Sequence, residues 1–177
     1  ATAAGAVTFG NGTTGVKGTI SKTNSLVGST EDDHVGNGGI TALSNGNYVV
    51  SSSTWDNGSI INAGAVTFGN GTTGVTGFIS ETNSLVGSSI SDLVGADGVT
   101  ALTNGNYVVS SGLWDNGEAT AAGAVTFGNG ITGVSGVVSA ANSLVGSSKL
   151  DFVGRGDFHV AEGGGPSVLA LPNGNYL

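Results

Sequence analysis

The residues of this chain best suited to chemistry are two tryptophan–aspartate pairs. Trp55-Asp56 and Trp114-Asp115 each precede an Asn-Gly turn, and they lie 59 residues apart. An exposed indole can stack on a sugar ring while the neighbouring polar groups bind its hydroxyls, so the pairs are candidates for a carbohydrate site. Tryptophan is also an amphipathic side chain that packs well at the edge of a sheet. The packing interpretation is favoured, and the sugar site is kept as the alternative.

Three further aspartates recur with the same spacing. Asp33, Asp92 and Asp151 each stand two residues before a Val-Gly pair. Such acids can contact a metal ion or a sugar, but an aspartate in a tight loop commonly accepts hydrogen bonds from backbone amides. The loop interpretation is favoured. The prediction is therefore no metal site and no cofactor, with these three aspartates as the weak metal candidates.

The tripeptide Arg155-Gly156-Asp157 is the sequence that integrins bind. It lies in the one segment that interrupts the repeat pattern, and insertions in repeat proteins form exposed loops that often carry function. A three-residue match in a glycine-rich chain also arises readily by chance. The tripeptide is therefore a binding candidate without a second motif to support it.

No catalytic motif accompanies these residues. His34 and His159 are isolated and stand in unlike contexts, and there is no nucleophile elbow and no phosphate loop with a lysine. Gly-x-Gly patterns such as Gly10-Asn11-Gly12 follow a predicted strand but open no helix, so they do not fit dinucleotide binding. Near-identical repeats also argue against an active site. The prediction is a protein that is not an enzyme.

Composition narrows the class of protein further. The chain has four basic and twelve acidic residues and a net charge of −8, which argues against nucleic acid and against anionic membrane surfaces. There is no cysteine to build a disulfide framework, and no apolar run approaches the roughly 18–20 residues of a membrane span. Low charge with abundant Gly, Asn, Ser and Thr is typical of secreted β-rich proteins, so we expect an extracellular or cell-surface location.

An internal repeat dominates the sequence. The run Gly-Ala-Val-Thr-Phe-Gly-Asn-Gly begins at Gly5, Gly64 and Gly123, which gives a period of 59 residues. The predicted units are residues 1–59, 60–118 and 119–177. The third unit carries about ten extra residues within 155–167 and stops before a third Trp-Asp-Asn-Gly. We therefore expect the parent protein to continue beyond this chain.

Each unit has the pattern of about four short antiparallel strands. Val7 and Phe9 alternate with polar neighbours, which is the period of a half-buried strand. Asn-Gly pairs such as Asn45-Gly46 predict hairpins with type I′ turns, in which both central residues have positive φ. No helical periodicity is present. The predicted fold is all-β, with the units as blades of a larger or two-chain β-propeller; the alternative is a β-solenoid.

The order of these elements resembles the FG-GAP repeat of integrin-α-type propellers. Asp33-His34-Val35-Gly36 is similar to the Asp-x-Phe-Gly element, Tyr48 to Ser52 to the next strand, and Gly64 to Phe68 to the closing strand. The calcium loop of that family is not carried over, because the matching segment, Ser44 to Asn47, contains no acid and Ca²⁺ prefers several carboxylates.

The units also resemble the tandem repeats of large, filamentous-haemagglutinin-like bacterial surface proteins. This resemblance rests on the Asn-Gly-Asn-Tyr-Val-Val-Ser-Ser and Trp-Asp-Asn-Gly blocks. It implies a secreted, non-catalytic structural or adhesive segment. The alternative is a lectin-like module with one site per repeat. The expected partners are other copies of the repeat, a homo-oligomer, glycans or a host cell-surface receptor, without nucleic acid or membrane insertion.

Overall fold

The computed structural model describes residues 1–156 and 167–177, which form β-strands, turns and loops and no helix. The all-β prediction is therefore confirmed for the described residues. None of them forms a helix long and apolar enough to span a membrane. The strands are β1 (Ala6–Val7), β2 (Leu26–Val27), β3 (Gly39–Ala42), β4 (Tyr48–Ser52), β5 (Ala65–Gly69), β6 (Gly77–Phe78), β7 (Ser84–Val86), β8 (Val99–Ala101), β9 (Tyr107–Ser111), β10 (Ala124–Gly128), β11 (Gly136–Val137) and β12 (Ser143–Val145).

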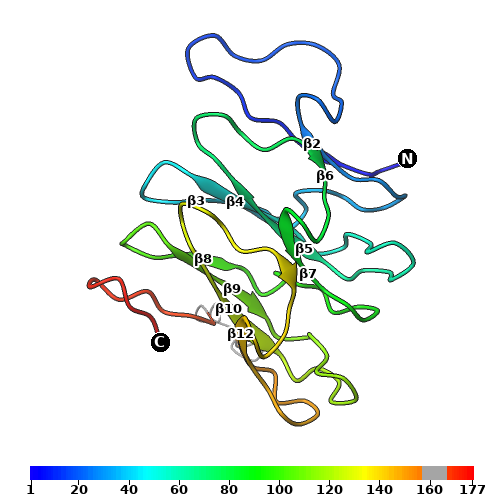
Figure 1. Ribbon diagram of the computed structural model, residues 1–177, viewed down its shortest axis with the longest axis vertical. Coiled ribbons are helices and arrows are strands. Elements are labelled where there is room, and N and C mark those ends of the chain that lie inside the picture. Colours follow the sequence, from blue (N-terminus) through cyan, green and yellow to red (C-terminus); the bar gives the residue numbers. More distant parts are fainter. Residues whose placement is uncertain (157–166) are drawn as a thin grey trace, which may run out of the picture.

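The strands form three open sheets that follow one another along the chain. Sheet I has the order β1-β2-β6, sheet II the order β11-β7-β5-β4-β3, and sheet III the order β12-β10-β9-β8. Within sheets II and III, four strands pair as antiparallel neighbours in chain order. Figure 1 shows the sheets arranged along the longest axis of the molecule, with sheet I towards the top, sheet III towards the bottom and the C-terminal segment beside sheet III. None of the three sheets is closed.

The antiparallel hairpins form because apolar, β-branched runs alternate with short glycine-containing turns. The β3–β4 turn closes when the Gly46 N–H donates to the Leu43 carbonyl at 3.0 Å and the Leu43 N–H donates to the Asn47 carbonyl at 2.8 Å. Gly46 has a φ of 89°, whereas Asn45 is not in the positive-φ region. The predicted hairpin is present, but the predicted type I′ turn is wrong, because only its glycine adopts positive φ.

Two short parallel pairings tie each repeat to the one before it. β6 lies between β5 and β7 in sequence, but it pairs with β2 in sheet I. In the same way, β11 pairs with β7 in sheet II rather than with a strand of sheet III. Sheet II therefore combines β3 and β4 of the first unit, β5 and β7 of the second and β11 of the third, so a sheet is built from more than one sequence repeat. These cross-repeat pairs were not among the predicted antiparallel hairpins.

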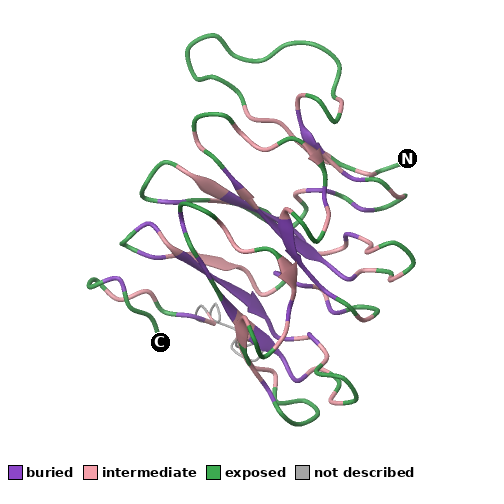
Figure 2. Ribbon diagram, viewed as in Figure 1, coloured by how far each residue is buried: buried purple, intermediate pink, exposed green. Residues whose placement is uncertain are grey.

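The core lies between the faces of successive sheets. Val49 and Val50 are adjacent in β4, so their side chains point to opposite faces of sheet II. Val50 packs with Leu26 and Trp55 between sheets I and II, and Val49 packs with Tyr107 and Trp114 between sheets II and III. The central strands β4, β5 and β9 are the most continuously buried strands of sheets II and III, as Figure 2 shows. Sheet II is thus buried on both faces.

The third interface of this kind lies between sheet III and the C-terminal segment. Leu102 and Val108 pack there against Val168. Residues 169–177 form a narrow hairpin, in which the Leu169 and Leu177 backbones exchange hydrogen bonds of 2.9 and 3.0 Å. The segment corresponds in sequence to β3 and β4, and it covers sheet III as sheet III covers sheet II.

Candidate functional site

The two predicted tryptophan sites lie inside the sheet interfaces. Trp55 and Trp114 are only 3 % and 4 % exposed, so their ring faces contact core side chains rather than solvent. Their indole nitrogens are also buried, and neither has a hydrogen-bond acceptor among the described residues. In this conformation the rings are not open to a stacking sugar. The burial favours the packing interpretation of these residues.

The aspartates beside the tryptophans hold a loop together. Asp56 Oδ1 accepts a hydrogen bond of 2.7 Å from the Asn62 N–H, and Asp115 Oδ1 accepts one of 2.8 Å from the Ala121 N–H. Both donors have positive φ, 54° and 50°, in the loop that leads back to the next strand. These carboxylates therefore stabilise a strained turn.

Asp33 and Asp92 are the most heavily bonded acids in the structure, and both are fully buried. Asp92 accepts hydrogen bonds from the backbone N–H groups of Ser88, Ser89 and Asp115, at 2.8, 2.8 and 2.9 Å. Asp33 accepts the equivalent bonds from Ser29, Thr30 and Asp56, and a further one from the Thr30 hydroxyl.

Burial of Asp92 raises the pKa of its carboxyl group above the ordinary value, and the three amide hydrogen bonds partly offset that rise. Asp151 differs from the other two aspartates because it is exposed, and its carboxylate accepts from Ser147 and Ser148 only, within the described residues. No group of three histidine, cysteine or acidic side chains in residues 1–156 and 167–177 is placed to hold a metal ion.

The predicted integrin-type tripeptide is only partly described. Arg155 and Gly156 lie after the loop of Asp151, and the Arg155 guanidinium stands 4.4 Å from the centre of the Phe152 ring. Asp157 lies outside the described residues, as does His159. His34 is half exposed and its Nε2 lies 3.9 Å from Asp32 Oδ1, in a surface loop.

Asparagine side chains, which the sequence analysis assigns to turns, also form hydrogen bonds between repeats. Asn45 Nδ2 and Asn47 Nδ2 both donate to the Gly130 carbonyl, at 2.7 and 2.8 Å, across the interface of sheets II and III. Asn116 Nδ2 donates to the Gly146 carbonyl at 2.9 Å. Their recurrence in the Asn-Gly-Asn and Trp-Asp-Asn-Gly blocks was the available signal, but it was assigned to turns alone.

An open depression of about 500 Å³ lies near the C-terminal end. Asn104, Asn106, Phe127, Tyr176 and Leu177 contribute to its lining. It contains no acid, base or nucleophile grouping beyond these amides and the tyrosine hydroxyl. Its chemistry is that of a surface that accepts a polypeptide backbone, with amide donors beside apolar rings.

Together, the fold and these contacts define an all-β repeat protein in which the recurring polar residues bind the chain to itself. The chain belongs to the family described as "Repeat of unknown function (DUF5650)", which matches residues 1–37, 42–96 and 101–155. This match confirms three repeats. It does not identify the FG-GAP or haemagglutinin-like families, so both resemblances stay predictions. No curated protein and no solved structure matches the chain.

Proposed function

We propose that this chain is a non-catalytic structural or adhesive repeat segment of a secreted or cell-surface protein. The observation that carries the proposal is the use of its recurring polar residues. The buried aspartates accept hydrogen bonds from backbone amides within loops, and asparagines donate to carbonyls of other repeats, as Asn45 does to Gly130 and Asn116 to Gly146. Residues that recur because every unit needs them for stacking favour a role in which repetition supplies length and rigidity.

The architecture we propose for this role is an open stack of blade-like sheets. Sheet II contains four consecutive antiparallel strands, β3, β4, β5 and β7, packed between two other layers, which is typical of a propeller blade. Hydrogen bonds between equivalent positions one repeat apart, such as Ser44 Oγ to the Thr103 carbonyl at 3.3 Å, are typical of stacked repeat proteins. Such a stack grows by adding units at its ends, and it presents its loops along the sides.

The composition of the chain supports an extracellular location. The chain has four lysine and arginine residues against twelve acids, so it offers little attraction to nucleic acid or to an anionic membrane surface. It has neither cysteine nor methionine, and both are oxidation-prone side chains. A scaffold exposed to an oxidising medium benefits from their absence.

Location and adhesion are tested in the organism that makes the protein. Antibodies against the purified chain should label intact cells, or the medium around them, without permeabilisation. Beads coated with the chain should then be measured for retention on cells or extracellular matrix, with beads coated with heat-unfolded chain as the control. Labelling that requires permeabilisation would overturn the proposed location. Equal retention of folded and unfolded chain would remove the adhesive role.

The lectin alternative has a separate readout. Because Trp55 and Trp114 are buried in packing positions, sugars should leave the tryptophan emission spectrum unchanged, and a glycan array should give no specific signal. A saturable spectral shift with one sugar class would replace the structural proposal with a binding module.

A further inference from the structure

The two ends of the stack carry positions that are buried everywhere else in the repeat. Leu26 and Leu85 are 0 % exposed, whereas their equivalent in the last repeat, Leu144, is 71 % exposed. At the opposite end, Ile20 is 61 % exposed, whereas Ile79 and Val138, at the same position of the next repeats, are 4 % and 2 % exposed. The two exposed positions lie at opposite ends of the series of sheets, Ile20 before β2 of sheet I and Leu144 in β12 of sheet III.

Strand pairing explains why these positions differ. β2 is flanked by β6 of the next repeat, and β7 is flanked by β11. The corresponding edge of β12 has no such partner among the described residues. Residues 18–20, which are equivalent to β6 and β11, have no partner strand in the part of the chain that is described. One end therefore has an open strand edge, and the other has the segment that pairs with that edge in both internal interfaces.

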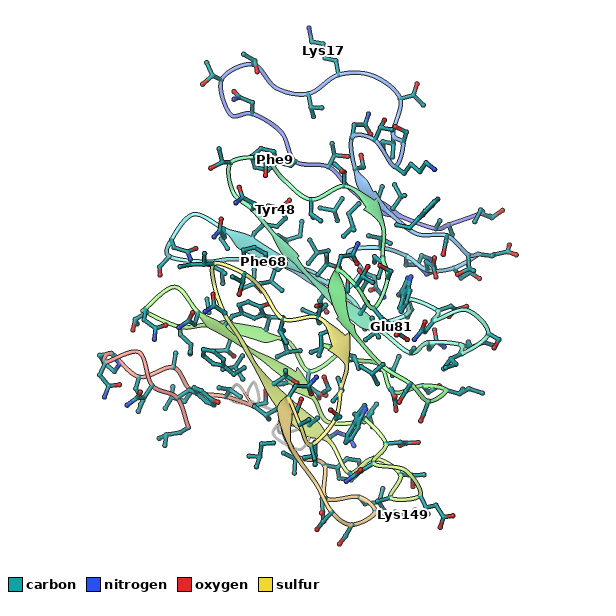
Figure 3. The ribbon with its side chains drawn as sticks, in the orientation of Figure 1. Phe9, Lys17, Tyr48, Phe68, Glu81 and Lys149 are labelled. Carbon is teal, nitrogen blue, oxygen red and sulfur yellow. The ribbon has the colours of Figure 1, made fainter. Side chains whose placement is uncertain are left out.

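The aromatic contacts also leave one half of a contact at each end of the molecule. Phe9 stacks on Tyr48 with ring centres 6.2 Å apart, as seen side by side in Figure 3. A Cβ atom added to Gly74 would lie 2.6 Å from Phe9, and one added to Gly133 would lie 2.7 Å from Phe68, so each phenylalanine packs directly against a glycine loop of the next repeat. Phe127 is 44 % exposed at the C-terminal end, and the equivalent loop glycine, Gly15, has open space around it at the other end.

Asparagine side chains at the C-terminal end add amide donors beside Phe127. In the internal interface, Asn45 and Asn47 donate to the carbonyl of Gly130. Their equivalents, Asn104 and Asn106, line the cavity of about 500 Å³ beside Phe127. The equivalent of Gly130 in the first repeat is Gly12, in an exposed loop at the opposite end.

We propose that the C-terminal face formed by Phe127, Leu144, Tyr176 and the cavity asparagines binds the N-terminal face, residues 9–20, of a second copy of this chain, head to tail. The internal interface sets the register. Because Leu85 pairs with Gly136 and Val86 with Val137, Leu144 and Val145 pair with Gly18 and Thr19 of the second copy. Because Tyr48 pairs with Gly69, Tyr176 pairs with its Gly10.

This contact joins two different faces, so it does not close by itself, and association continues to trimers and longer chains. The copies each carry a net charge of −8. Since the contacts are apolar and backbone-mediated, added salt screens the repulsion between copies and strengthens the association.

The test is the mass of the 177-residue chain by sedimentation velocity and light scattering, from about 1 µM to about 1 mM, a span that covers weak and moderate affinities. The average mass should rise above the 17.1 kDa of the monomer and past that of a dimer, with a larger rise at high salt. Leu144→Asp blocks one face and Ile20→Asp blocks the other, and each variant alone should remain a monomer. Both residues are exposed, so the substitutions leave the fold intact, which circular dichroism checks.

A mixture of the two variants distinguishes head-to-tail contact from any symmetric one. Each variant retains the face that the other has lost, so the mixture should form a 1:1 complex and nothing larger. Ile90→Asp is the matched control, because Ile90 is 67 % exposed in the loop between β7 and β8 and belongs to neither of the two proposed faces, and it should associate like the original chain. A monomer at every concentration, dimers of Leu144→Asp alone, or loss of association in Ile90→Asp would each overturn the proposal.

Discussion

The internal interface between sheets II and III and the outer face of sheet III, which the C-terminal segment covers only in part, contain the same residue types at the same repeat positions. In the interface, Leu85 packs with Val49 and Val66 on one side and with residues of the next sheet on the other. On the outer face of sheet III, Leu144 lies in the edge strand β12 and is 71 % exposed. Each repeat unit therefore forms half of two interfaces rather than a self-sufficient core. Stability therefore comes from neighbour contacts, as in other linear repeat proteins.

The largest expected difference comes from the same leucine-to-alanine substitution made at Leu85 and at Leu144. Leu85→Ala should lower the free energy of unfolding by about 2–5 kcal/mol, because it removes a fully buried side chain and leaves a cavity. Leu144→Ala, at 71 % exposure, should change it by less than about 0.5 kcal/mol. Urea titrations at low protein concentration measure both values. Equal losses would mean that repeat position, rather than the interface, determines stability.

Some features of the fold could be predicted from the sequence, and others could not. Alternation around Val7 and Phe9 and the 59-residue period were enough for strands, hairpins and repeats, because these depend on local spacing. The cross-repeat pairs β2–β6 and β7–β11 depend on contacts between units, which a local pattern does not encode.

The candidate site shows the same limit. Trp55 and Trp114 stand beside polar turn residues, which is the local pattern both of a sugar site and of a packing anchor. Only the position of the next sheet determines that their rings are covered. Asn45 was assigned to a turn, and it does accept from the Asn47 N–H. Its second role, as a donor to Gly130, depends on a residue 85 positions away.

Alkaline pH provides a second test of the buried interface. Burial raises the pKa of the Tyr107 hydroxyl to about 12, with the Val134 amide partly offsetting the rise. The unfolded tyrosine has a pKa of about 10, so between pH 10 and 12 the unfolded chain loses this proton while the folded chain keeps it. The free energy of unfolding should therefore fall by on the order of 2–3 kcal/mol across that window.

The variant Tyr107→Phe should remove most of that alkaline decrease, since the titrating group is gone. Tyr48 is a matched comparison, because burial also raises the pKa of its hydroxyl but the residue is only half buried, and its hydroxyl accepts a hydrogen bond of 3.2 Å from the Val75 N–H. Urea titrations at pH 8, 10 and 11.5 measure how steeply the free energy of unfolding decreases with pH in the original chain and in each variant. If Tyr107→Phe shows the same decrease as the original chain, the alkaline sensitivity comes from outside this interface.

The smallest effect concerns the asparagines, where the two regions differ by one hydrogen bond. Asn45 and Asn104 each bond within their own turn and to the following hairpin, through the carbonyls of Gly105 and Gly174. Asn45 alone also donates to Gly130, at 2.7 Å. A hydrogen bond of this kind contributes about 1 kcal/mol net.

Asn45→Ala should therefore lower the free energy of unfolding by about 1 kcal/mol more than Asn104→Ala in urea titrations of the monomer. At protein concentrations where copies associate head to tail, the gap should narrow, because Asn104 then gains the Gly12 carbonyl of a second copy. If the difference between the two variants stays constant from low to high protein concentration, Asn104 takes no part in the contact between copies.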